Sequence, residues 1–213
     1  MSSMTSKRLD FPSAGRNANA IAQVLAAELP AGPCAVLEIA SGSGQHGVQF
    51  CREIPNISWW PTDLDPAHLN SINAWRVHAD LTDRIHVATA LDVCAENWRT
   101  GQIQKEWPKK FDAVVNINMI HISPWAATLG LMEGAAQVIR PGGVLVLYGP
   151  FKKHGKHTAP SNADFDESLK SRNSAWGVRD LDEVAAIARA QGLTLRTEIA
   201  MPANNLSLIF ARA

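Results

Sequence analysis

The stretch that decides the fold is residues 35–47, which read AVLEIASGSGQHG. Its first part is rich in branched apolar residues, as expected of a strand buried in a parallel sheet. Its last six residues, 42–47, match the pattern G-x-G-x-x-G. Such a turn lets the backbone approach a ligand, and the helix that follows presents free N–H groups. The stretch therefore predicts a site for a nucleotide-like cofactor at the first strand of an α/β sheet.

On both sides of this stretch, short apolar runs alternate with amphipathic segments. Strands are expected at 35–40, 57–61, 85–88, 111–117 and 144–150, and helices at 19–29, 46–54, 67–80, 98–106, 124–139 and 181–191. This alternation predicts a parallel sheet with right-handed crossovers. Two further strands, 193–200 and 206–211, are joined by a short link and are therefore expected to form an antiparallel pair.

The bulk properties narrow the class of protein. With 213 residues, one domain over 1–213 is expected, in which 1–30 holds a lead-in helix. Twenty basic and twenty acidic residues cancel, without a long run of either sign. This balance argues against a nucleic-acid or membrane partner and favours a small-molecule substrate.

Cysteine content and hydropathy add two expectations. The three cysteines are widely spaced, which fits neither a disulfide framework nor a zinc pattern, so no metal site is expected. The first ten residues lack the apolar core of a signal peptide, and no stretch is apolar for long enough to cross a bilayer. A cytoplasmic location is therefore expected.

The glycine pattern alone is compatible with two cofactor classes. Asp63 and Asp65 follow it by about twenty residues, which is also the signature of a dinucleotide site. Glu38 favours the other class, because a carboxylate beside the turn suits an ammonium and a sulfonium better than a pyrophosphate. Charges a few ångström apart interact by about 1 to 4 kcal/mol at water-like to surface dielectric. The pattern thus favours S-adenosylmethionine, with an NAD(P)-dependent oxidoreductase as the alternative.

Residues 38–44, an acid followed by small residues and G-x-G, resemble the first motif of class I methyltransferases. The resemblance implies a Rossmann-like sheet of seven strands in the order 3-2-1-4-5-7-6, with the last strand antiparallel and helices on both faces. It also implies that Asp63 binds the ribose hydroxyls, with Asp65 as the alternative, and that Asp92 contacts the adenine amino group. The remaining residues expected at the cofactor are Arg16, Asn17, Glu38, Ala40, Gly42, Gly44, His46, Leu64 and Asn116. Of these, Arg16 would pair with the methionine carboxylate, since a guanidinium forms two parallel bonds to such a group.

A narrower resemblance extends over essentially the whole chain. The segments that carry it are 16–17, 116–121, 148–151, 161–169 and 176–180. They are similar to a small, poorly characterised methyltransferase branch that includes methyltransferase-like protein 26. The resemblance implies a methyltransferase that uses S-adenosylmethionine, and it leaves the acceptor open.

Polar residues after the fourth and fifth expected strands are the candidates for catalysis. His121 is the candidate general base because imidazole titrates near neutral pH, although a buried packing role is an equally good interpretation. Asn116 or Asn118 would instead orient an amine nucleophile, but the Pro-Pro-Tyr that follows such an asparagine in N-methyltransferases is missing. Tyr148 would reach the substrate through its hydroxyl, or pack in the core.

Residues 151–179 form a polar stretch with little periodicity, and we expect this stretch to be a substrate lid. Its pocket candidates are Asn162, Asp164, Trp176 and Arg179, and its basic residues Lys152, Lys153, His154 and Lys156 would favour an acidic substrate or form a solvated face. The sequence predicts a methyltransferase that uses S-adenosylmethionine and acts on a small molecule. The alternatives are the oxidoreductase and a methyltransferase-like binding module without cofactor.

Overall fold

The structure is a computed structural model that describes residues 7–102 and 104–213. The chain forms two compact units, Met1–Asp92 and Val93–Ala213. Residues 1–6 of the expected N-terminal region and residue 103 of the expected helix at 98–106 lie outside the described residues.

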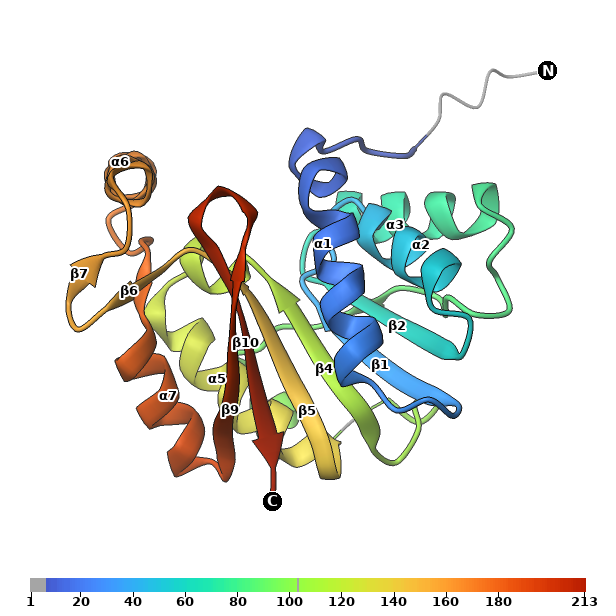
Figure 1. Cartoon of the computed structure of the whole chain (residues 1–213). Coiled ribbons are helices and arrows are strands. Elements are labelled where there is room, and N and C mark those ends of the chain that lie inside the picture. Colours follow the sequence, from blue (N-terminus) through green and yellow to red (C-terminus); the bar gives the residue numbers. More distant parts are fainter. Residues whose placement is uncertain (1–6, 103) are drawn as a thin grey trace. The chain divides into compact units, whose positions relative to one another are not determined.

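The first unit alternates helices and strands as the sequence predicts. Its elements are α1 (Pro12–Glu28), β1 (Cys34–Ile39), α2 (Gln45–Glu53), β2 (Ile57–Asp63), α3 (Pro66–His78) and β3 (Thr89–Ala90) (Figure 1). Strand β2 pairs in parallel with both β1 and β3. Helices α2 and α3 pack against each other and against β2, and α1 packs on α2. The carboxyl ends of three parallel strands therefore meet at one edge of this unit.

The expected strand at 85–88 is wrong. Ile85 forms only an isolated bridge with Trp59, and the third strand is the short β3. The Ala88 N–H donates to the Asn73 side chain at 3.0 Å rather than to a neighbouring strand. Val87 is 63% exposed, so the apolar run that suggested a buried strand does not fill the core.

The second unit contains the other strands and helices. They are α4 (Glu96–Arg99), β4 (Phe111–Ile117), η1 (Met119–His121), α5 (Trp125–Val138), β5 (Ile139–Gly149), β6 (Phe151–Lys153), β7 (Lys156–His157), α6 (Pro160–Arg172), β8 (Arg179–Asp180), α7 (Leu181–Ala190), β9 (Leu193–Met201), η2 (Pro202–Asn204) and β10 (Asn205–Arg212). Strand β4 has the expected bounds, whereas β5 begins at Ile139, five residues before the expected strand at 144–150. Helix α4 is shorter than expected, because Gly101 adopts a left-handed φ of 74° just after it.

The interpretation of 151–179 as a stretch without regular structure is wrong. Strands β6, β7 and β8 form a second, three-stranded sheet in the order β7-β6-β8, and α6 contributes thirteen further residues (Figure 1). The buried residues of α6 are Asn162, Asp166 and Leu169, of which two are polar. Hydrophobic periodicity cannot reveal a helix whose buried face is polar.

The main sheet has seven strands in the order β3-β2-β1-β4-β5-β10-β9, and this confirms the predicted fold class. Strand β10 pairs antiparallel with both β5 and β9, as the short link at 201–205 predicts. Strand β5 is buried over its last seven residues, which accounts for their unbroken apolar character. Among residues 7–102 and 104–213, no helix is long and apolar enough to cross a membrane.

Candidate functional site

The glycine turn between β1 and α2 has an unusual backbone. Ala40, Gly42 and Gly44 all have left-handed φ values, of 58°, 59° and 91°. The left-handed conformation costs an alanine about 1–2 kcal/mol. Strain of this kind is typical of ligand-binding segments, where the surrounding structure holds it in place. Hydrogen bonds inside the protein hold this shape, since the Gly42 N–H donates to Asp63 at 2.8 Å and the Gly44 N–H donates to the Ser41 carbonyl at 3.1 Å.

The carboxylate of Glu38 lies in the core beneath this turn. It is 1% exposed, and its Oε2 accepts a hydrogen bond from Trp59 Nε1 at 2.9 Å. Burial raises the pKa of Glu38 to about 7, against the effect of hydrogen bonds with Ser41 and Trp59. Thr62 Oγ1 donates to the Glu38 carbonyl at 2.7 Å and links the ends of β1 and β2. Glu38, the acid predicted to face the cofactor, is therefore buried and stabilises the turn through hydrogen bonds.

Asp63 ends β2 and points at the glycine turn. Its Oδ2 accepts from the Gly42 N–H at 2.8 Å, and its Oδ1 accepts from Asp65 N at 3.0 Å. His68 Nδ1 lies 3.1 Å from the same Oδ1. Asp65, the alternative ribose ligand, instead caps α3 by accepting from Ala67 N at 2.7 Å. Of the two aspartates, only Asp63 is joined to the glycine turn.

Two further candidates lie at the same edge of the first unit. Leu64 follows Asp63 directly and is 65% exposed, which is unusual for a leucine beside a buried acid. The Leu91 N–H donates to the Asp63 carbonyl at 3.1 Å. Asp92 follows Leu91 directly, so it lies next to a residue that is hydrogen-bonded to the end of β2. The structure therefore brings Gly42, Asp63, Leu64 and Asp92 together.

Segments before β1 also reach the glycine turn. Asn17 of α1 and His46 of α2 are paired, with Oδ1 and Nε2 2.8 Å apart, and burial lowers the pKa of His46 to about 4. Arg16 is exposed on the same helix. The ring of Phe11 lies over Gly42, and the Phe11 N–H donates to the Gln45 side chain at 2.8 Å. Phe11 and Gln45 were not singled out in the sequence, because Phe11 lies outside the motif and Gln45 occupies one of its variable positions.

The second unit gathers the candidates for acceptor chemistry. Asn116 is 1% exposed in β4, and Asn118 follows that strand with a left-handed φ of 64°. The Asn118 N–H donates to the Tyr148 carbonyl at 2.9 Å, and the Tyr148 hydroxyl accepts from Asn205 Nδ2 at 3.0 Å. A side chain at Gly149 would collide with the His121 ring, since its Cβ would lie 2.4 Å from Nε2. The ends of β4 and β5 thus hold all four predicted residues.

His121 is completely buried. Burial and the charge of Arg179 lower the pKa of His121 to about 3, so the ring is neutral at physiological pH and accepts a proton poorly. Its carbonyl accepts from the Gly177 N–H at 2.9 Å, and Arg179 Nε donates to the neighbouring Ile120 carbonyl at 2.9 Å. These contacts tie η1 to the segment before β8. The geometry fits a positioning role for His121 better than the predicted role of general base.

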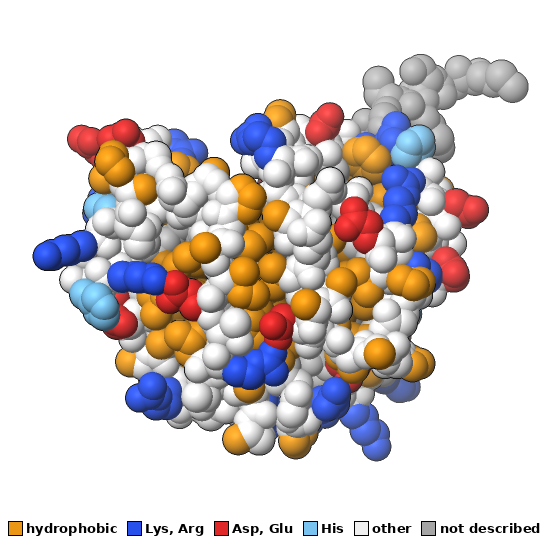
Figure 2. Space-filling view, in the orientation of Figure 1, with side chains coloured by type: hydrophobic (Ala, Val, Ile, Leu, Met, Phe, Trp, Pro, Cys, Tyr) orange, Lys and Arg blue, Asp and Glu red, His pale blue; other side chains and the backbone are white. Residues whose placement is uncertain are grey.

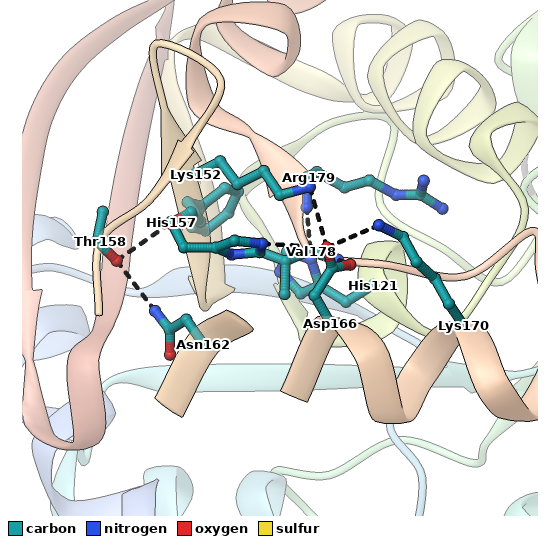
Figure 3. Close-up of polar contacts among 10 residues, drawn as sticks. His121, Lys152, His157, Thr158, Asn162, Asp166, Lys170, Val178 and Arg179 are labelled. Carbon is teal, nitrogen blue, oxygen red and sulfur yellow. Dashed lines mark hydrogen bonds and ion pairs between the residues drawn. The ribbon is translucent and has the colours of Figure 1, made fainter. Parts of the chain in front are cut away.

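A cluster of charged residues centres on Asp166 of α6, and no pattern in the sequence links its members (Figure 3). We call Asp166, Lys152, His157 and Lys170 the Asp166 cluster. Lys170 Nζ, Lys152 Nζ and His157 Nε2 lie 2.8, 3.0 and 3.2 Å from Asp166 Oδ2, while Oδ1 accepts from Val178 N at 2.8 Å. Burial opposes ionisation of Asp166, but the hydrogen bonds from Lys170, Lys152 and Val178 lower its pKa to about 2. Only Lys152 of the cluster was named as a candidate residue.

The other lid candidates have separate positions. Asn162 is 4% exposed and donates to the Asn204 carbonyl at 2.9 Å, which fixes α6 to the turn between β9 and β10. Asp164 is exposed, and Trp176 lies under the guanidinium of Arg172. Of the candidates in the segment 151–179, Asn162 therefore has a buried structural contact, whereas Asp164 lies on the surface.

The Asp166→Asn substitution is expected to lower the free energy of unfolding by about 2–3 kcal/mol. Loss of a buried ion pair costs about 3–5 kcal/mol. The effect should be smaller here, because Lys170 is half exposed and its ammonium can turn into water. Urea denaturation followed by circular dichroism measures this difference.

The matched control is Asp164→Asn, which makes the same chemical change at an exposed position two residues earlier on α6. Its stability is expected to stay within about 0.5 kcal/mol of the wild type. Equal effects of the two substitutions would contradict a central role for Asp166 in this segment.

Residues 8–212 match the model of a family described as a protein of unknown function, DUF938. The chain belongs to the DUF938 family. The match covers nearly all of both units of this DUF938 chain, so the glycine turn and the Asp166 cluster lie within the family's shared sequence.

Solved structures of methyltransferases have a similar fold. An O-methyltransferase family protein from Burkholderia thailandensis is 20% identical with a TM-score of 0.76, over 92% of this DUF938 chain and 56% of its own. An O-methyltransferase family 2 protein from Planctomyces limnophilus, in complex with apigenin, is 20% identical with a TM-score of 0.74, and the match covers 94% of this chain and 58% of that protein's chain. The O-methyltransferase NcsB1 from neocarzinostatin biosynthesis, in complex with S-adenosylmethionine and 2-hydroxy-5-methyl naphthoic acid, is 14% identical with a TM-score of 0.70, over 92% and 56%. The chain spans a little over half the length of each, and at these identities the similarity concerns the fold.

Proposed function

We propose that the chain is a methyltransferase that uses S-adenosylmethionine and acts on a small molecule. The observation that carries the proposal is the hydrogen bond between Asp63 and the Gly42 N–H, which joins the second-strand acid to the glycine turn. An exposed leucine follows this acid directly. A carboxylate that accepts hydroxyl groups, beside an apolar side chain that packs on a flat base, suits an adenosine group.

The residues of the first unit fit the other parts of the cofactor. The left-handed turn at Ala40, Gly42 and Gly44 lets the backbone approach the ligand at the start of α2. Glu38 would act through this turn, because its hydrogen bonds with Ser41 and Trp59 hold the end of β1 in place. When bound, the cofactor supplies an activated methyl group on a sulfonium.

In the second unit, we propose that Asn118 and Tyr148 contact the acceptor. The main task for methyl transfer is alignment of the acceptor atom. We propose that neutral His121 holds η1 in place and thereby positions Asn118. This role requires no proton transfer by a ring whose pKa is about 3.

The similar structures support a small-molecule acceptor. Two of them contain aromatic small molecules, apigenin and a naphthoic acid, and one contains S-adenosylmethionine. The balanced charge of the chain also argues against a polyanionic partner. Figure 2 supports the same view, since basic and acidic side chains are interspersed over the face that it presents.

The test is a thermal shift assay with S-adenosylhomocysteine in comparison with NAD(H) and NADP(H). At a free concentration of about 100 times Kd, a ligand stabilises the folded state by about 2.7 kcal/mol. In a chain of this size, this corresponds to a rise in Tm of about 5–10 °C. We expect this rise with S-adenosylhomocysteine alone, and we expect Asp63→Asn to remove it.

Asp65→Asn is the matched control, because it changes a neighbouring acid that caps α3 and does not contact the turn. Its ligand-induced shift is expected to equal that of the wild type, even if its own Tm is lower. A selective shift with NAD(H) or NADP(H) would favour the oxidoreductase. A shift with none of these compounds would favour a binding module without cofactor.

A further inference from the structure

The segment 151–179 carries more positive charge than the rest of the chain. It contains six lysine and arginine residues but three aspartate and glutamate residues, whereas the whole chain has twenty of each kind. In Figure 2, basic, histidine and acidic side chains all lie at the left edge, where Figure 1 shows β6, β7 and α6. The excess charge is thus concentrated on one part of the second unit.

Ion pairs outside the Asp166 cluster neutralise some of these charges. Lys153 is paired with Glu198, and His154 Nδ1 lies 2.8 Å from the Asp182 carboxylate. The guanidinium of Arg179 donates to main-chain carbonyls of residues 120, 123 and 175. Hydrogen bonds to carbonyls leave the Arg179 charge in place, close enough to Asp166 for the two to interact electrostatically.

Within the Asp166 cluster, one carboxylate oxygen contacts two ammonium groups and the His157 ring (Figure 3). Asp166 is 3% exposed and carries one negative charge, against the two positive charges of Lys152 and Lys170. One carboxylate cannot neutralise this set, and buried or half-buried charge without a counter-charge is costly.

A second observation points to a missing group at the same place. The Nδ1 atom of His157 is buried and, among the residues that the structure describes, has no hydrogen-bond partner. Buried polar atoms in folded proteins normally have such a partner. Each ammonium also has three donors, of which the contact with Asp166 occupies one.

We propose that the Asp166 cluster binds an oxyanion, a carboxylate or a phosphate, on a small molecule. The anion would accept hydrogen bonds from the free donors of Lys152 and Lys170 beside the His157 ring, while Asp166 holds these three side chains in place. Charge-assisted hydrogen bonds of this kind are the strong ones in proteins. The proposed function assigns the methyl acceptor to this unit. Resting on that proposal, we identify the anion as the acidic group of the acceptor.

The test is calorimetric titration of the full chain with benzoate, phenyl phosphate and uncharged benzamide, without S-adenosylmethionine. We expect benzoate or phenyl phosphate to bind about tenfold more tightly than benzamide. The tighter of the two anions identifies the chemistry as carboxylate or phosphate. Equal binding of all three compounds would overturn the proposal.

Lys170→Met removes one cation from the cluster at a half-exposed position, and it is expected to weaken binding of the preferred anion about tenfold. Lys156→Met, at an exposed position in β7, is the matched control and is expected to bind like the wild type. His157→Gln tests the same site without loss of a lysine, and it is expected to lower the affinity for the preferred anion about fivefold. Wild-type anion affinity in both cluster variants would overturn the proposal.

These outcomes are independent of the cofactor. If the anion binds as expected while S-adenosylhomocysteine gives no thermal shift, the anion site stands and the methyltransferase proposal fails. If the cofactor binds but the anions bind no better than benzamide, the methyltransferase proposal stands and the acidic acceptor is excluded.

Discussion

The Gly44→Ala substitution is expected to lower the free energy of unfolding by about 2–5 kcal/mol. Gly44 has a left-handed φ of 91°, which costs an L-residue about 1–2 kcal/mol. A Cβ at this position would lie 2.8 Å from the backbone Cα of Ile72 in α3, and overpacking of this kind costs about a further 1–3 kcal/mol. Because Ile72 contributes a backbone atom, rotation of a side chain cannot relieve the contact.

The same substitution should also weaken binding of the cofactor, since the clash displaces the first turn of α2 relative to the glycine turn. Urea denaturation measures the loss of stability, and thermal shift with S-adenosylhomocysteine measures the loss of binding. Gly32→Ala is the matched control, because its Cβ would meet nothing within 4 Å. We expect the control to keep both properties, and a stable Gly44→Ala variant with wild-type binding would contradict this account of the turn.

The Glu38→Gln substitution is expected to change how stability depends on pH. Burial raises the pKa of Glu38 from 4.5 to about 7, so between these pH values the folded protein holds one proton more than the unfolded chain. The free energy of unfolding therefore falls as the pH rises, by about 1.4 kcal/mol per pH unit and by about 3 kcal/mol in all. Glutamine carries no proton that can be lost, and it still accepts the hydrogen bond from Trp59.

The measurement is urea denaturation of both proteins at about pH 5 and about pH 8. Relative to the wild type, we expect Glu38→Gln to gain about 3 kcal/mol of stability between the two pH values. His46 and His121 titrate in both proteins, so their contribution cancels in the difference. Glu167→Gln, at an exposed position of α6, controls for the loss of a carboxylate that is not buried. If the difference in the free energy of unfolding between Glu38→Gln and the wild type is the same at both pH values, Glu38 is not buried in its protonated form.

The sequence was most informative where one physical signal dominates. Strand β4 has the expected bounds because it is apolar and buried almost throughout. The antiparallel pair β9 and β10 followed from a link too short for a crossover. By contrast, β3 has two residues and α6 buries polar side chains, so neither produces a hydrophobic period.

The candidate site divides in the same way. The motif predicted Asp63 and the glycine turn together, and a hydrogen bond joins them. The sequence could not tell Asp63 from Asp65, because both carboxylates follow the turn at a similar distance along the chain. The structure separates their roles, since one contacts the turn and the other caps α3. The motif also could not reveal that Glu38 is enclosed by Trp59, which lies 21 residues away along the chain.

The order of the main strands was implied by the resemblance to class I methyltransferases, whereas the sequence by itself determined the class of fold and the place of the glycine turn. These properties depend on local patterns, namely apolar runs, glycines and the lengths of links. Only the tertiary structure decided the state of Glu38 and His121 and the existence of the Asp166 cluster. Their pKa values and ion pairs depend on burial and on partners that are distant in sequence, such as Lys152 and Asp166, and a linear pattern carries no record of either.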